Sequence, residues 1–139
     1  MTLEEKITQT QEDNNLLANY LGWELDGVFY HTYKQFGIHL WNPITYNSRA
    51  HHMEQLTFHE SWDWLFLVID KINGMGKEYS FATFKTYVSL TVEKGGKVYK
   101  DFSFAYSEYI TATQTGKEAT FKLLVKYVKW HNEQEKLKN

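Results

Sequence analysis

One alternating segment, Thr86–Val92, constrains the fold of this chain more than any other feature. It reads TYVSLTV, a strict period-two pattern typical of a strand with one buried face. The sequence EKGG then turns the chain, and KVYKDFSFAY follows with a second apolar series in phase with the first. The apolar positions of the two segments are Val88, Leu90, Val92, Val98, Phe102 and Phe104. This pattern predicts an antiparallel hairpin that is covered on one face.

A helix with a broad apolar stripe is expected before this hairpin. In FHESWDWLFLVIDKI, apolar side chains from Trp62 to Ile72 recur at helical spacing, and the following Asn-Gly ends the pattern. Ser61 or His59 lies near the expected start. Trp62 and Trp64 are two residues apart and diverge by about 200° around a helix. Most of the stretch is therefore expected in the core, but both tryptophans cannot be centred on one buried face.

Two further helices are expected near the ends of the chain. LLANYL, Leu16–Leu21, forms one apolar stripe after the capping sequence EDNN, and Gly22 is a plausible stop. Thr115 and Glu118 have the spacing of a capping box at the start of the last helix, whose tail NEQEKLKN is expected to fray. A stripe of lysines on that helix is interpreted as a solvated face. It contains Lys122, Lys126 and Lys129.

The segment between the first two helices has a weaker pattern. Residues Trp23–Trp41 alternate loosely, with breaks at Gly27 and Gly37, which indicates two short strands or one strand and an irregular loop. NPITYNSRAHHMEQ follows and is expected to be a loop. The order of elements predicts one α+β domain over residues 1–139, with helices packed on a small, mostly antiparallel sheet.

Composition excludes several functional classes. The chain has no cysteine, so it can hold neither a disulfide nor a thiolate metal site. A net charge of −2 disfavours nucleic-acid binding, because nucleic-acid binders usually carry a basic face. The acidic N-terminus is not a signal peptide, and no apolar run reaches the roughly 20 residues that span a bilayer. We expect a soluble, cytoplasmic protein without membrane contact.

Aromatic residues make up 17% of the chain, which is more than a small core requires. Rings dominate interface energetics and also stack on nucleobases. We therefore expect some of these rings to face a ligand or a partner.

Three segments, with the hairpin between the last two, carry a family resemblance: NNLLANYLGW, HESWDWLFLVIDKI and GKEATFKLLVKYVKWHNE. About three quarters of the chain is similar in this way to small proteins from phages and prophages of Bacteroidetes-type bacteria. Those proteins are similar to what is called a phage α-β-α sandwich domain. The resemblance implies an accessory protein in the cytoplasm of a bacterial host, and it supplies no catalytic residues. The chain departs from the common pattern in an aromatic, histidine-bearing insert of roughly 29–59.

The motifs of common catalytic sites are absent from the sequence. There is no P-loop, no G-x-G-x-x-G, no G-x-S-x-G and no HExxH. The six histidines lack the spacing of a metal site, and His51 and His52 would point to opposite faces of a strand. A two-histidine phosphodiesterase needs two H-x-[ST] motifs, and HTY at His31 suggests half of one but lacks the pattern. The sequence favours a non-enzymatic protein without metal or cofactor.

Arg49 suggests a binding role instead, because it stands in YNSRAHH among aromatic and polar residues. A guanidinium binds phosphate through paired hydrogen bonds and stacks on rings. The candidate ligand-binding residues are Arg49, Lys34 and His52 for phosphate and Trp41, Tyr33 and Tyr46 for a base. An exposed arginine in a polar loop explains the same residues without a ligand.

Three functions remain open at this point. The first is a phage anti-defence protein that sequesters a cyclic nucleotide or a cyclic ADP-ribose signal in a nearly enclosed pocket, for which we expect a homo-oligomer. The second is a protein that inhibits a host defence enzyme through aromatic surface residues. The third is a single-stranded nucleic-acid binder that uses the lysine stripe and sheet aromatics, against which the mild acidity counts.

Overall fold

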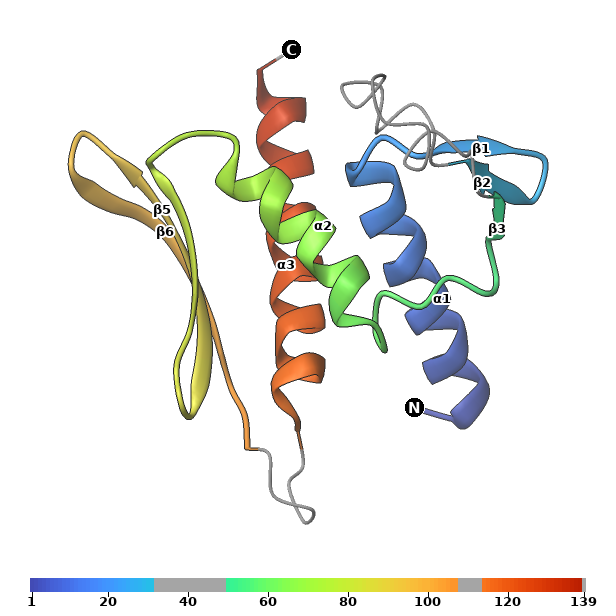
Figure 1. Ribbon diagram of the computed structural model, residues 1–139. Coiled ribbons are helices and arrows are strands. Elements are labelled where there is room, and N and C mark those ends of the chain that lie inside the picture. Colours follow the sequence, from blue (N-terminus) through green and yellow to red (C-terminus); the bar gives the residue numbers. More distant parts are fainter. Residues whose placement is uncertain (32–49, 108–113, 139) are drawn as a thin grey trace. The chain divides into compact units, whose positions relative to one another are not determined.

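The computed structural model describes residues 1–31, 50–107 and 114–138 (Figure 1). It contains three α-helices and two three-stranded antiparallel sheets, which confirms the α+β class. The contacts divide the chain into an N-terminal unit, Met1–Thr57, and a C-terminal unit, Phe58–Asn139. Each unit is described by itself, and the single domain stays a prediction.

The N-terminal unit begins with helix α1, Leu3–Tyr20. Thr2 caps it, since its hydroxyl accepts the backbone N–H of Glu5 at 3.1 Å. The expected start at EDNN is therefore wrong, because those residues lie inside the helix. The expected stop is confirmed: Gly22 follows the C-cap with a φ of 83°, a left-handed conformation that glycine adopts without steric cost.

A small sheet, called here the N-terminal sheet, follows α1. It has the order β1-β2-β3, with β1 at Glu24–Asp26, β2 at Phe29–His31 and β3 at Ala50–His52. Two short strands lie on either side of Gly27, whereas residues 32–41 of the predicted segment, with the expected break at Gly37, lie outside the described residues. The loop expected over AHH is wrong, because Ala50–His52 pairs with β2.

The C-terminal unit contains the predicted hairpin and the two predicted helices. Helix α2 is Trp62–Asn73, capped by the Ser61 hydroxyl, and helix α3 is Gly116–Leu137, capped by the Thr115 hydroxyl at 3.2 Å from the N–H of Glu118. The hairpin is β5, Tyr87–Lys94, and β6, Lys97–Ala105. Gly95 and Gly96 make its turn, with φ of 60° and 80°, as a two-residue turn of the primed type requires.

The hairpin belongs to a sheet of three strands, called here the C-terminal sheet, with the order β4-β5-β6. The sequence patterns did not indicate β4, Tyr79–Thr83. Helix α3 packs on β5 and β6, while α2 packs on β4 and on α3, so that the two helices form one layer and the sheet the other (Figure 1). The face towards the helices carries Val88, Leu90, Val92 and Phe102 in the core.

Two details of this unit differ from expectation. Val98 was expected in phase with the buried series, but it is exposed. The tail expected to fray continues α3 as far as Leu137. The lysines of the expected solvated stripe on α3 are all exposed: Lys122, Lys126 and Lys129.

Candidate functional site

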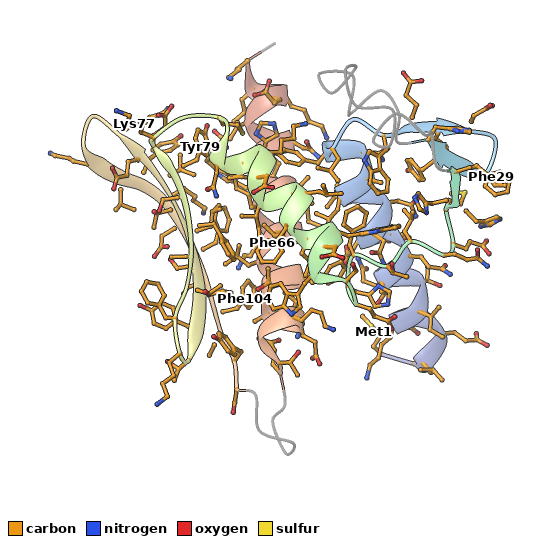
Figure 2. All side chains as sticks on the ribbon, viewed as in Figure 1. Met1, Phe29, Phe66, Lys77, Tyr79 and Phe104 are labelled. Carbon is orange, nitrogen blue, oxygen red and sulfur yellow. The ribbon has the colours of Figure 1, made fainter. Side chains whose placement is uncertain are left out.

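The face of the N-terminal sheet that carries Phe29 holds the best-defined group of candidate side chains. Asp26 pairs with Phe29, and Phe29 pairs with His52, so the three residues form one row across the sheet. Residues opposite one another in antiparallel strands place their side chains on the same face. The Phe29 ring is 44% exposed, and Figure 2 shows it on the side of the sheet away from α1.

His52 is held in a defined orientation beside this ring. The two ring centroids are 5.4 Å apart at 83°, an edge-to-face contact. The Nδ1 atom of His52 accepts the backbone N–H of Glu54 at 3.1 Å. Because Nδ1 acts as the acceptor, the neutral imidazole carries its proton on Nε2, which is then a hydrogen-bond donor. The row therefore presents an acceptor at Asp26, a ring at Phe29 and a donor at His52.

The opposite face of the sheet is anchored to α1. Tyr30 is buried and donates a hydrogen bond from its hydroxyl to Oδ1 of Asn19 at 3.2 Å. Burial raises the pKa of the Tyr30 phenol, and the hydrogen bond with Asn19 offsets part of that rise. His51, opposite Tyr30, stacks on Trp23 with centroids 5.6 Å apart. His51 and His52 thus point to opposite faces, as a strand requires.

Of the six candidate ligand-binding residues, the structure describes His52 alone. Tyr33, Lys34, Trp41, Tyr46 and Arg49 lie outside the described residues. The chain leaves the sheet after His31 and returns at Ala50, and these two residues face each other in the register. The sequence did not indicate Phe29 as a candidate ligand-binding residue, because Phe29 stands beside His52 only through the pairing of β2 with β3, and no sequence pattern predicted that pairing.

A metal centre finds no support in the part of the chain that the structure describes. There, no group of three or more histidine or acidic side chains is close enough to hold an ion. Asp26 and His52 stand on either side of Phe29 and suit hydrogen bonds to an organic ligand better than coordination.

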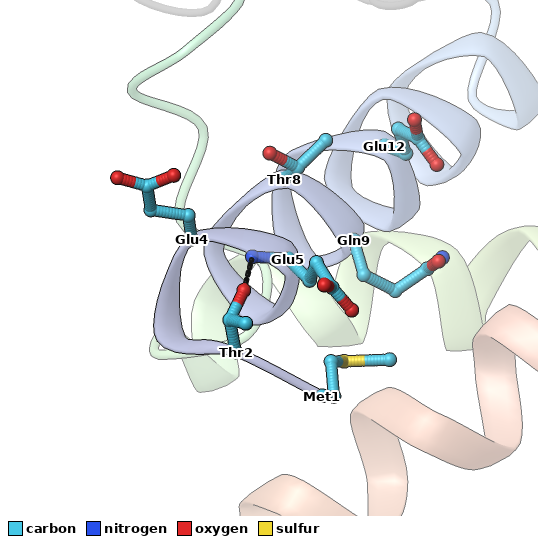
Figure 3. Close-up of a pocket in the computed structure, with 7 residues that line it drawn as sticks. All are labelled: Met1, Thr2, Glu4, Glu5, Thr8, Gln9 and Glu12. Atoms are coloured by element: carbon cyan, nitrogen blue, oxygen red, sulfur yellow. Dashed lines mark hydrogen bonds between the residues drawn. The ribbon is translucent and has the colours of Figure 1, made fainter.

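A separate cavity of about 600 Å³ lies beside the first turns of α1 (Figure 3). Its lining residues are Met1, Thr2, Glu4, Glu5, Thr8, Gln9 and Glu12. Three of them are carboxylates, so the cavity disfavours a phosphate-bearing ligand. It offers no ring for a base, and we assign no function to it.

None of the helices in residues 1–31, 50–107 and 114–138 is long and apolar enough to cross a membrane. A scan against protein-family models finds no match, and searches of curated proteins and of solved structures find no relative and no similar fold. Any functional inference therefore depends on the chemistry of the chain itself.

Proposed function

We propose that this protein binds a small nucleotide-type molecule without converting it, and that the outer row of the N-terminal sheet recognises the base. The observation that carries the proposal is the row Asp26, Phe29 and His52. An exposed ring stacks on the face of any nucleobase. A carboxylate on one side and an N–H on the other match the donors and acceptors at the edge of a base or on a ribose.

The phosphate contacts are proposed to come from residues 32–49, the part of the chain between β2 and β3. The residues that flank it, His31 and Ala50, belong to the same sheet as Phe29. Arg49 and Lys34 are the cations that sequence analysis assigns to phosphate, and Arg49 directly precedes β3. Trp41, Tyr33 and Tyr46 remain the proposed second stacking partners for the ligand.

The biological role that fits such a binder is sequestration. We propose a phage accessory protein in the cytoplasm of a bacterial host, whose ligand is an immune signal such as a cyclic nucleotide or a cyclic ADP-ribose derivative. The phage origin in this proposal is the expectation drawn from the sequence, and the absence of common catalytic motifs from the sequence fits binding without conversion. Because a sequestering protein must outcompete the host sensor, we expect a second copy of the chain to help enclose the ligand, which size-exclusion chromatography would test.

Calorimetric titration with cyclic dinucleotides and cyclic ADP-ribose derivatives tests the site. Phe29→Ala removes the stacking surface and is expected to weaken binding about 5- to 150-fold, from roughly 1–3 kcal/mol per stacked base. His52→Asn keeps an oxygen to accept the N–H of Glu54 but removes the donor at Nε2. It is expected to weaken binding about fivefold, the effect of one hydrogen bond worth ~1 kcal/mol.

Phe84→Ala is the matched control, because Phe84 is 45% exposed, almost the same as Phe29, and lies in the other unit. It is expected to leave affinity unchanged. The proposal is wrong if none of these nucleotides binds at micromolar concentration, or if Phe29→Ala and Phe84→Ala have equal effects.

A second candidate function is inhibition of a host protein, and one observation favours it. Trp62 and Phe66 of α2 stack with ring centroids 5.6 Å apart, and both side chains are exposed. Exposed tryptophan and phenylalanine are typical of interface hot spots. A pull-down from host lysate tests this candidate: a single partner that Phe66→Ala releases supports it, and retention of that partner by the variant contradicts it.

A further inference from the structure

The β5–β6 ladder contains a bulge that redirects Tyr99. The register shifts between Val92 and Glu93, and Tyr99 is the extra residue on β6 that faces no partner. A regular ladder would place Tyr99 on the uncovered face of the sheet, since its neighbours in phase with Phe102 point to the helices. Instead its ring lies 6.1 Å from that of Trp130 on α3, at 61°. A bulge commonly re-aims a side chain in this way.

Trp130 joins this tyrosine to the core. Its ring lies 5.8 Å from Phe102 and 6.1 Å from Tyr127, both of which are buried. Tyr99 itself is 47% exposed. The two rings meet edge to face, and this pair, called here the platform, packs through Trp130 against the buried rings of Phe102 and Tyr127 while part of Tyr99 is open to solvent.

Lysine amines lie over the aromatic rings of this region. The Nζ atom of Lys94 lies 4.1 Å from the centre of the Tyr99 ring, and that of Lys100 lies 5.5 Å from Phe102. Cations at this distance are attracted to the ring face. These contacts orient the two amines beside the platform.

A third amine extends the series along α3. Lys126 precedes Trp130 by one helical turn, and its Nζ atom lies 5.7 Å from the centre of the Phe104 ring. These amines come from β5, β6 and α3, three elements that pack on one another. Together with the rings beside them they form what is called here the basic–aromatic surface; it consists of Lys94, Tyr99, Lys100, Phe104, Lys126 and Trp130.

The charge around this surface is locally positive. Lys97, Lys122 and Lys129 are exposed on β6 and α3, and these two elements together carry seven lysines against four acidic residues, namely Asp101, Glu118, Glu133 and Glu135. The residues of the C-terminal unit include twelve lysines against ten acidic residues, whereas residues 1–57 include seven acidic against three basic. The net charge of −2 is thus the sum of an acidic N-terminal unit and a basic C-terminal unit.

We propose that the basic–aromatic surface binds single-stranded nucleic acid. The amines can neutralise phosphates along a strand, and the Tyr99–Trp130 platform can accept an unpaired base. A duplex keeps its bases stacked inside and offers nothing to the platform. The alternation of cations with rings is the combination found in non-specific single-strand binders. This surface is independent of the nucleotide site proposed on the N-terminal sheet.

Fluorescence anisotropy of a labelled 20-residue oligothymidine tests the proposal in a salt series. Three amines predict a slope of log K against log salt of about −2, because each phosphate contact on a single strand contributes about 0.7. Lys126→Gln and Lys100→Gln are each expected to reduce the slope by about 0.7. Tyr99→Ala is expected to weaken binding about 5- to 150-fold.

Tyr87→Ala and Lys77→Gln are the matched controls. Tyr87 is 40% exposed on the same sheet but stacks on Phe84, and Lys77 lies before β4. Both controls are expected to bind like the unmodified protein, and circular dichroism checks that every variant is folded.

Four results would overturn the proposal. The first is no anisotropy change at 50 mM salt with about 100 µM protein. The second is equal affinity for the oligothymidine, a duplex of the same length and heparin, which would show that bases contribute nothing. The third is an equal loss for Tyr99→Ala and Tyr87→Ala. Preference for an acidic peptide over the oligothymidine would likewise contradict it.

Discussion

Tyr30 provides the sharpest test of how the N-terminal sheet is held in place. The side chain is buried and donates its hydroxyl hydrogen bond to Asn19 of α1. Two substitutions separate the contribution of the ring from that of the hydroxyl. Tyr30→Phe keeps the ring and removes the hydrogen bond, whereas Tyr30→Ala removes both.

The two substitutions are expected to lower the free energy of unfolding by amounts that differ severalfold. A hydrogen bond contributes about 1 kcal/mol net, and Asn19 is exposed, so water can replace the lost hydroxyl. Tyr30→Phe is therefore expected to lower the free energy of unfolding by at most about 1 kcal/mol. Removing a fully buried ring costs about 3–5 kcal/mol, because the cavity that remains adds to the lost transfer free energy. Tyr30→Ala is expected to lie in that range.

Urea denaturation followed by circular dichroism measures both variants, and hydrogen exchange of the amides in β1 and β2 localises the effect. Tyr87→Ala is the control, since Tyr87 is a half-exposed strand tyrosine whose loss is expected to cost about 1 kcal/mol or less. If Tyr30→Ala costs no more than Tyr87→Ala, Tyr30 does not anchor the sheet and the support proposed for the Phe29 row is wrong.

Three further predictions concern the C-terminal unit. Leu124→Ala, at a fully buried position of α3, is expected to cost about 2–5 kcal/mol by urea denaturation, whereas Leu137→Ala on the same helix, 79% exposed, is expected to change stability by less than about 0.5 kcal/mol. Equal costs would contradict the packing of α3. Thr115→Ala removes the N-cap of α3 and is expected to cost about 1 kcal/mol in the same assay, whereas Thr115→Ser should cost much less. Burial lowers the pKa of His131 below its ordinary value of 6.5. As the pH falls below 6.5, the unfolded chain binds the proton before the folded protein does, so the free energy of unfolding decreases. Urea midpoints at pH 7.5 and 5.5 should differ less for His131→Gln than for the unmodified protein, and an unchanged difference would refute this.

Local signals explain what the sequence predicts well. The cap at Ser61, the capping box at Thr115 and the stripe of α2 each depend on residues within a few positions of one another. The Gly95–Gly96 turn and the alternation of β5 have the same character. The structure contains these caps, stripes and turns because tertiary packing favours the same local conformations.

The errors arise where pairing or packing at long range decides the outcome. The first half of α1 is polar and exposed, so no apolar stripe marks it, although Thr2 caps it. Ala50–His52 is too short to show alternation, and its pairing with β2 alone makes it a strand. β4 is likewise short and half-buried, and it is defined by its ladder with β5.

The candidate sites show the same limit. His52 could be predicted from its residue type, but the Phe29 row depends on the register of three strands. Tyr99 meets Trp130 because of a bulge that shifts the β5–β6 register, and no pattern in the sequence indicates this bulge. Net charge was also a poor guide, because the acidic residues 1–57 mask the lysines of the C-terminal unit.

The most direct test of the nucleotide-binding proposal is mass spectrometry of the molecules released when the purified protein is denatured. The protein and its Phe29→Ala and Phe84→Ala variants would be expressed in bacteria that make defence nucleotides. The account predicts about one nucleotide-type molecule per site from the unmodified protein and from Phe84→Ala, and a strongly reduced amount from Phe29→Ala. A blank from all three proteins, or the same yield from all three, would contradict it.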